Sequence, residues 1–206
     1  LYFDQMKLDP AKPQWADRDR MILSKGHAAP VLYSVLARRG FFDPALLPTL
    51  RQMGSPLQGH PHMEKLAGLD CSSGSLGQGL SVANGLALAA KRLGKDYRTY
   101  CLMGDGEVQE GQVWEAAMTA AHFGLDNVCA IVDDNGVQLD GLTKDIMNVE
   151  PLDEKFRAFG WHVISVDGHD LAALQAARPA AVTPLMAAAA AIFRKPLREI
   201  FSMVCD

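Results

Sequence analysis

The sequence predicts an α/β fold in which a doubly wound, mainly parallel sheet is flanked by helices. Short apolar runs rich in β-branched and aromatic residues alternate along the chain with longer segments whose apolar residues recur at helical spacing. Such alternation indicates parallel crossover units, and sheets of this kind bind ligands at the carboxyl ends of their strands. The 206 residues suit one domain with a small appendage.

The individual elements follow from spacing and from glycine and proline positions. We expect short helices over residues 29–39 and 44–53, and Gly40 ends the first. A loop rich in glycine, proline and histidine comes next, and a glycine-rich segment then opens a long helix that ends near Leu93. The later predicted elements are a strand over 97–103, a helix over 110–123, a strand over 127–133, a helix over 152–159 and a strand over 161–166.

Composition excludes several classes of protein. Hydrophobic residues make up 49% and charged residues 21%, which is typical of a soluble globular domain. The net charge of −4 and the lack of a basic cluster argue against a nucleic-acid partner. The longest apolar run, near residues 185–193, is too short to span a bilayer. The four cysteines have no paired spacing, which argues against a zinc site or a disulfide framework and favours a reducing cytoplasm.

Two acidic motifs follow neighbouring predicted strands. Asp105 lies in MGDGEVQEG after the first, and Asn135 lies in IVDDNGVQLDG after the second. Each alone is most simply a turn. Together, at the ends of adjacent strands, they offer a carboxylate and an amide oxygen, which are ligands that Mg²⁺ prefers when phosphates complete its coordination. The pair therefore predicts a magnesium diphosphate site.

A glycine-rich segment and two histidines add to this prediction. The segment from Gly74 to Gly79 lacks the glycine order of a dinucleotide fingerprint, but a glycine-rich entry to a long helix leaves N–H groups for a phosphate. A flexible helix cap is the alternative interpretation. His27 and His60 lie in loops and suit proton transfer near neutral pH, whereas we expect His62 to be a bystander at the loop surface.

These residues together resemble the N-terminal, diphosphate-binding part of transketolases, which in split transketolases is a separate subunit. The resemblance runs over about residues 1–170. It rests on the stretches LSKGHAAPVLY, GHPHM, SSGSLGQGLSVANGLALA, GDGEVQEGQVWEA, DDNGVQLDG and NVEPLDEKFRAFGWHV. The Asp105 and Asn135 motifs are common to thiamine diphosphate enzymes, and the Ser-Lys-Gly-His and Gly-Ser-Leu-Gly-Gln-Gly stretches narrow the resemblance to transketolases.

The resemblance implies thiamine diphosphate and Mg²⁺ as cofactors and assigns roles to individual residues. The implied metal ligands are Asp105, Asn135 and the carbonyl of Val137. The implied cofactor contacts are His27, Gly74, Ser75, Leu76, Gly106, Glu107 and Asn135. The implied catalytic residues are His27 near the reacting carbon, His60 at the donor-sugar hydroxyls, and Glu110, which with Glu115 matches an acidic interface pair. Solvated helix-face charge is the simpler interpretation of those two glutamates.

The resemblance also implies a partner. In transketolases a glutamate from a second, pyrimidine-binding domain activates the cofactor, and 206 residues do not hold that domain. We therefore expect a C-terminal transketolase subunit, in a heterotetramer or dimer of halves. The substrates would be sugar phosphates, by family default those of pentoses and hexoses in the pentose phosphate pathway. The expected reaction is transfer of a two-carbon ketol unit from a ketose phosphate to an aldose phosphate.

Two departures from the family set the expected domain limits. No Ser-Gly-His segment precedes the first residues, and after Asp170 the expected Lys-Pro-Thr strand and Gly-Lys-Gly loop are missing. We assign residues 1–170 to a diphosphate-binding domain that lacks its start, and 171–206 to an atypical tail. Truncation, a frame shift or a lineage-specific tail each explain the latter. Another thiamine diphosphate enzyme, such as a deoxyxylulose phosphate synthase or a 2-oxoacid dehydrogenase component, and a non-catalytic cofactor-binding module stay open.

Overall fold

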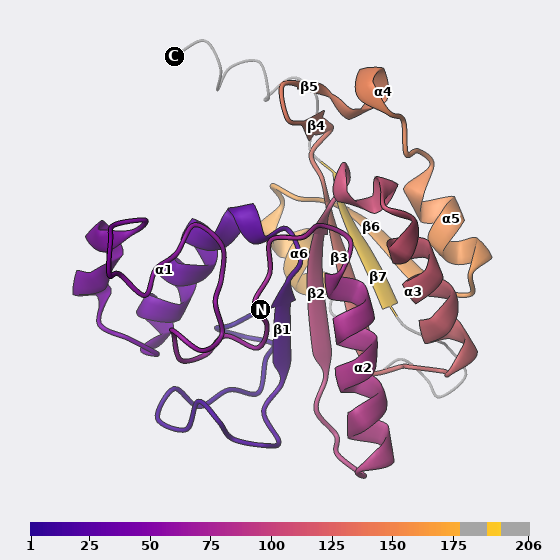
Figure 1. The fold of residues 1–206 in the computed structure, drawn as a ribbon. Helices are drawn as coiled ribbons and strands as arrows, with labels where there is room; N and C mark the ends of the chain where they lie inside the picture. Colours follow the sequence, from indigo (N-terminus) through magenta and orange to yellow (C-terminus); the bar gives the residue numbers. More distant parts are fainter. Residues whose placement is uncertain (178–188, 195–206) are drawn as a thin grey trace.

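The computed structural model describes residues 1–177 and 189–194 of the chain (Figure 1). Its strands are β1 (Arg20–Leu23), β2 (Thr99–Gly104), β3 (Val128–Asp134), β4 (Val137–Gln138), β5 (Gly141–Leu142), β6 (His162–Asp167) and β7 (Ala189–Arg194). Its α-helices are α1 (Ala29–Arg39), α2 (Gly79–Arg92), α3 (Gly111–His122), α4 (Thr143–Ile146), α5 (Leu152–Ala158) and α6 (Leu171–Ala176). Short 3₁₀ turns are η1 (Gly26–Ala28), η2 (Pro44–Thr49) and η3 (Glu107–Gln109).

A five-stranded sheet with the order β1-β2-β3-β7-β6 forms the centre of the molecule. Every neighbouring pair in it is parallel. In Figure 1, α1 lies on one side of the sheet and α2, α3 and α5 lie on the other, while β4, β5 and α4 project beyond the carboxyl ends of the strands. The predicted doubly wound α/β fold is therefore confirmed.

The side chains of the central strands alternate between two hydrophobic cores. In β2, Cys101 and Met103 pack beneath α2 and α3, whereas Tyr100 and Leu102 face the core around α1. In β3, Ala130 and Val132 face the core beneath α2 and α3, whereas Cys129 and Ile131 face the core around α1. A strand whose two faces are both covered shows a continuous apolar run, which is why β2 and β3 were predictable.

Most predicted elements are found within one or two residues of their expected bounds. The helix expected over 44–53 is wrong, because η2 is a 3₁₀ turn that contains Pro48 and is followed by Arg51 with a φ of 60°. Proline removes an N–H and clashes with the preceding turn of an α-helix, so the segment does not extend as one. Strand β1 was not predicted, since only Met21, Ile22 and Leu23 are apolar between charged flanks.

Strand β7 was also not predicted, and it lies inside the sheet. Ala190 and Ile192 pack in the core beneath α5, and the strand pairs with β3 on one side and β6 on the other. Alanine has a low strand propensity, so this alanine-rich stretch carries no strand signal of its own. Part of the segment assigned to an atypical tail thus completes the sheet. The remaining tail residues, 178–188 and 195–206, fall outside the described residues.

Among the described residues, no helix combines the length and apolar character needed to cross a membrane.

A buried ion pair fixes the loop that precedes the glycine-rich segment. Arg18 is 5% exposed, and its guanidinium donates to both Asp70 carboxylate oxygens at 2.6 and 3.0 Å. Asp70 also accepts the Met21 N–H at 2.9 Å, so the loop is tied to the start of β1. Removing two charges from water costs free energy. The two hydrogen bonds between the guanidinium and the carboxylate, together with the further hydrogen bonds of both groups, offset that cost.

We predict that Arg18→Ala lowers the free energy of unfolding by about 3–5 kcal/mol, because it leaves a buried carboxylate without its main partner. Urea denaturation measures the loss. The matched control is Arg157→Ala, whose guanidinium forms a surface pair with Asp153 at 2.7 Å. That exposed pair contributes no more than about 1 kcal/mol. Equal losses for the two variants would contradict the anchoring role of Arg18.

Candidate functional site

The register of the sheet brings the two acidic motifs together. Gly104 at the end of β2 lies opposite Asp133 in β3, so Asp105 and Asn135 leave the sheet at the same edge and line one cavity of about 270 Å³. Asp105 is 2% exposed, and its Oδ2 accepts the Gly136 N–H at 3.0 Å and the Thr143 hydroxyl at 2.7 Å. Within the described part of the chain, its hydrogen bonds are made by Oδ2, which leaves Oδ1 for a ligand.

Asn135 is held in one orientation by its own neighbours. Its Nδ2 donates to Asp133 Oδ2 at 3.2 Å, and its Oδ1 accepts the Val137 N–H at 2.9 Å. Asp133 is in turn paired with the Lys25 ammonium at 2.8 Å, from the loop after β1. These contacts fix which atom of the amide is the oxygen, and a metal needs that oxygen.

Three carboxyl groups, those of Asp105, Asp134 and Glu150, line the cavity. Burial, together with the charge of Glu150, a hydrogen bond to Glu150 and the charge of Asp105, raises the pKa of Asp134 to about 7. Arg194 at the end of β7 offsets part of this charge, with its guanidinium 3.6 Å from Asp134 and 3.5 Å from Glu150. A region with more carboxylates than basic groups favours a bound cation.

The residues present fit a magnesium diphosphate. The predicted ligands are one carboxylate, one amide oxygen and one main-chain carbonyl, and Mg²⁺ takes few protein ligands when phosphates are present. Among the described residues, no group of three or more His, Cys, Asp or Glu could hold a metal by itself. The site would therefore need ligand phosphates, and that is the expected arrangement for a metal that enters with its diphosphate.

The two predicted histidines lie next to the glycine-rich segment. A Cβ built at Gly74 would come within 3.3 Å of the His60 ring, and one built at Gly26 would come within 2.8 Å of the Gly74 nitrogen. His27 follows Gly26, so its loop and the His60 loop meet at Gly74. The hydroxyl of Ser73 is buried there without a hydrogen-bond partner in the described structure. The structure thus brings His27, His60 and Gly74 into one cluster.

The electrostatics agree with this proximity. Desolvation lowers the pKa of His27, and the charges of Lys25 and His60 lower it further while Glu107 opposes the change. A histidine held neutral near pH 7 can accept a proton. His62 is not the surface residue that we expected. It is half-buried, and its Nδ1 is buried without a hydrogen-bond partner among the described residues. A bond from the Ser73 N–H to the Pro61 carbonyl at 3.2 Å ties the neighbouring backbone to the glycine-rich segment.

The glycine-rich segment does not offer all of the N–H groups that the sequence predicted. Gly77 donates its N–H to Glu107 Oε1 at 2.9 Å, and Gly79 donates to Ser24 Oγ at 3.1 Å. Both donors are therefore used within the protein, and the prediction of free N–H groups at these two positions is wrong. The implied contacts of Gly74, Ser75 and Leu76 with a cofactor stay predictions.

The turn after Asp105 is closed by a pair of amides. Gln109 and Gln138 donate to each other at 2.6 and 2.9 Å, and Gln109 also donates to the Met147 carbonyl at 2.9 Å. A Cβ at Gly106 would lie 3.1 Å from Gln138 Cγ, so the turn packs closely against β4. This brings Gly106 and the Val137 segment to the same edge as Asp105.

Of the predicted interface glutamates, Glu110 immediately precedes α3 and Glu115 lies in its second turn. Glu110 and Glu115 are both exposed, and Met118 on the same helix is 50% exposed. Glu110 Cβ would be 2.6 Å from a Cβ at Gly77, so the residue adjoins the glycine-rich segment. Glu110 thus lies on the surface beside the glycine-rich segment, and the interface role of the pair stays a prediction.

Sequence reasoning missed several residues that shape the site. Thr143 gave no signal, because a threonine in a polar loop is common and its bond to Asp105 spans 38 residues. Arg194 lay in a segment for which no strand was predicted. Lys25 and Ser24 could have been found, since both belong to the Ser-Lys-Gly-His stretch that was used only for its histidine.

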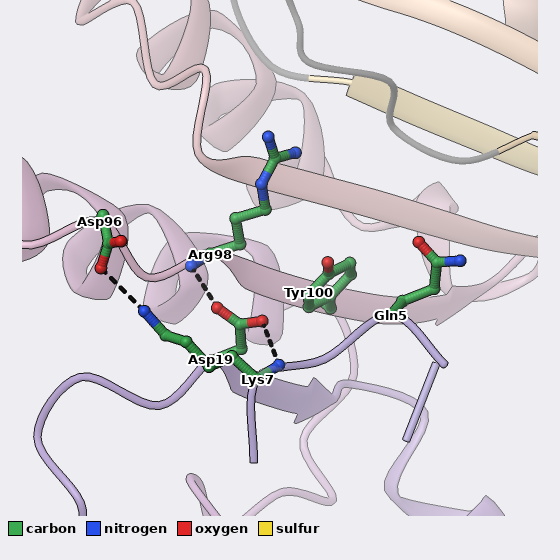
Figure 2. A pocket seen from close by; sticks show the side chains of 6 residues that line it. All are labelled: Gln5, Lys7, Asp19, Asp96, Arg98 and Tyr100. Atoms are coloured by element: carbon green, nitrogen blue, oxygen red, sulfur yellow. Dashed lines mark hydrogen bonds and ion pairs between the residues drawn. The ribbon is translucent and has the colours of Figure 1, made fainter. Parts of the chain in front are cut away.

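A second pocket of about 270 Å³ lies at the amino ends of β1 and β2, away from this site (Figure 2). Asp19 accepts the backbone N–H groups of Lys7 and Arg98, both at 2.8 Å, and the Lys7 ammonium pairs with Asp96 at 2.8 Å. Its acidic groups are thus bonded to protein partners.

Known proteins are similar to this chain along most of its length. It is 50% identical over 170 residues to the 6-deoxy-6-sulfo-D-fructose transketolase subunit SqwG of Clostridium sp. (strain MSTE9), over 82% of this chain and 62% of that protein. It is 44% identical over 171 residues to an apulose-4-phosphate transketolase subunit of Phocaeicola vulgatus, over 83% of this chain and 60% of that protein. The chain thus spans about three fifths of these curated relatives.

The structural comparison agrees. A crystal structure of a Pichia stipitis transketolase mutant in complex with fructose 6-phosphate superposes with a TM-score of 0.87 at 33% identity, over 93% of this chain and 30% of that one. The protein-family model described as "Transketolase, thiamine diphosphate binding domain" matches residues 1–189. The match extends through the segment assigned to an atypical tail as far as the first residue of β7. The chain belongs to the transketolase family, as its thiamine diphosphate-binding domain.

Proposed function

We propose that this chain is the diphosphate-binding part of a split transketolase. With a pyrimidine-binding partner subunit it would transfer a two-carbon ketol unit from a ketose phosphate to an aldose phosphate. The observation that carries the proposal is the link between two groups of residues. The ion pair of Lys25 with Asp133 at 2.8 Å joins the Asp105 and Asn135 edge to the His27 loop, and this loop meets the His60 loop at Gly74. Similarity to subunits named for sulfo-sugar and apulose phosphate transketolases supports the role of one half of a split enzyme.

In this proposal each site residue has a separate role. Asp105, Asn135 and the Val137 carbonyl would hold Mg²⁺, and the metal would offset the charge of the diphosphate. Thiamine diphosphate, when bound, supplies the carbanion chemistry of the reaction. His27 would hold or accept a proton beside the diphosphate, and His60 would orient the sugar hydroxyls. Within the described residues the cysteines are free thiols, which favours a cytoplasmic location.

The relatives are named for a sulfo-sugar and for apulose phosphate. The family resemblance implies the pentose and hexose phosphates of the pentose phosphate pathway as the default. We propose a sugar phosphate as the substrate class. The partner would supply the pyrimidine-binding domain, in a heterotetramer or a dimer of halves.

We predict that Asp105→Asn weakens Mg²⁺-dependent thiamine diphosphate binding by about 100-fold or more, because outer-shell partners of metal ligands alone are worth about 10–100-fold. The asparagine keeps an acceptor for Gly136 and Thr143, so the turn stays folded. Thr143→Val should lower the affinity for thiamine diphosphate about tenfold, since it removes the hydrogen bond from the Thr143 hydroxyl that orients Asp105. Calorimetry with the partner present measures both. Asp140→Asn, on an exposed residue, is the control. Unchanged binding by Asp105→Asn would remove the metal role.

We predict that His60→Ala raises the Michaelis constant for the ketose or lowers turnover, with thiamine diphosphate affinity near normal. The reason is that its ring lies beside Gly74 and does not line the cavity of Asp105 and Asn135. Steady-state kinetics and calorimetry separate the two effects. His62→Ala is the matched control and should change neither constant by more than about twofold. A larger effect from His62 than from His60 would show that the roles within this loop are reversed.

We predict that the chain alone performs no ketol transfer and that a pyrimidine-binding subunit restores it. Activation of the cofactor needs a glutamate from that second domain. A coupled assay for the released aldose phosphate measures transfer with and without the partner, Mg²⁺ and thiamine diphosphate. The mixture containing Asp105→Asn should stay inactive. Transfer by the unaccompanied chain would contradict the split-subunit proposal.

A further inference from the structure

A single buried carboxylate joins the segments that form the candidate site. Glu107 in η3 is 4% exposed. Its Oε1 accepts the Gly77 N–H at 2.9 Å and the Ser24 hydroxyl, and its Oε2 accepts the Gly104 N–H at 3.1 Å. The Ser24 oxygen in turn accepts the Gly79 N–H at 3.1 Å. The carboxylate thus connects the end of β1, the glycine-rich segment and the end of β2.

Each group that contacts the Glu107 side chain is a hydrogen-bond donor, so both side-chain oxygens must act as acceptors. Its three direct partners all donate, and a carboxylate is the side chain that only accepts. In the described part of the chain it forms no salt bridge. Charge-assisted bonds from N–H and O–H groups are therefore what compensates its burial. Both oxygens are engaged by the protein, which argues against a direct contact with a diphosphate.

The glycine-rich segment packs closely against Ser24 after β1 and against Glu110 after η3. A Cβ at Gly77, where φ is 81°, would come within 2.6 Å of Glu110, and one at Gly79 would overlap the side chain of Ser24. Since neither glycine has a side chain that could adjust, a displacement of one segment moves the next. The carboxylate therefore sets the relative positions of segments that carry different functional residues.

We propose that Glu107 is a positioning residue of the site, and that it is not the direct cofactor contact implied by the family resemblance. It fixes the glycine-rich segment and the His27 loop relative to Asp105, which precedes it by two residues. The importance of this arrangement for cofactor binding rests on the proposed function. The arrangement itself belongs to the cofactor-free chain and can be measured there.

The test compares amide hydrogen exchange of the cofactor-free chain with that of Glu107→Gln. A glutamine has nearly the same shape, but its NH₂ group must face a donor whichever way the amide is turned. We expect the amides of Gly77 and Gly104 to exchange about tenfold faster or more, because a bond to a charged acceptor is lost. The amide of Ile131 in the middle of β3 should be unchanged. Glu154→Gln, on an exposed residue of α5, is the matched control.

A second variant covers the case in which Glu107→Gln does not fold. Ser24→Ala keeps the carboxylate and removes the link to Gly79, so exchange should accelerate at Gly79. In the double variant, the combined loss should be smaller than the two single losses added together, since both belong to one network. With Mg²⁺, thiamine diphosphate and the partner present, each variant should bind cofactor about 10–100-fold more weakly.

The outcomes separate the alternatives. Unchanged exchange at Gly77 and Gly104 in Glu107→Gln, with weakened cofactor binding, would mean that Glu107 contacts the cofactor directly, and the proposal would be overturned. Equal acceleration at Ile131 would mean a general loss of stability, which also overturns it. Faster exchange at the three glycines alone supports the proposal even if the chain proves to have no role in ketol transfer.

Discussion

The parallel pairing of β2 with β3 is the constraint on which the site depends. In this register Gly104 lies opposite Asp133, so the residues that follow each strand are delivered to one edge of the sheet. A shift of one residue would turn Cys101 and Met103 away from α2 and α3 and into the opposite core. The packing of the two cores therefore fixes the site, because it permits one register.

Buried charge in this structure is organised in two different ways. Arg18 and Asp70 form a direct ion pair at 2.6 Å, remote from the cavity. Glu107 has N–H and O–H donors in place of a cation. Donors from the backbone bind a carboxylate without adding a positive charge that would compete with a metal at Asp105. The segments around the cavity are thus held without a further basic group beside Lys144 and Arg194, which line it.

The sequence predicted those parts of the fold whose signal is local. The strands β2 and β3 have continuous apolar runs, and the segment Gly74–Gly79 marks the start of α2. It did not predict β1, which is four residues long, or the alanine-rich β7, because both are strands only through their neighbours. The same holds for the site. Asp105 and Asn135 could be predicted because each follows a predicted strand. The bond from Thr143 to Asp105 and the bonds from the Gly77 and Gly79 N–H groups to protein acceptors could not, because they depend on tertiary contacts.

The two sides of the site differ in how complete they are within this chain. Asp105 and Thr143 are buried and bonded to each other, and Asn135 is oriented by Asp133 and Lys25. By contrast, His27, His60 and Glu110 are exposed, and exposed side chains are ordered when a further surface covers them. In the proposed function that surface belongs to the pyrimidine-binding partner. Metal and diphosphate would then be held by a preformed edge of this chain, whereas the groups that handle protons and sugar acquire their final geometry on assembly. Such a division would keep reaction chemistry from starting in an unassembled half, because the half that fixes the metal is not the half that activates the cofactor.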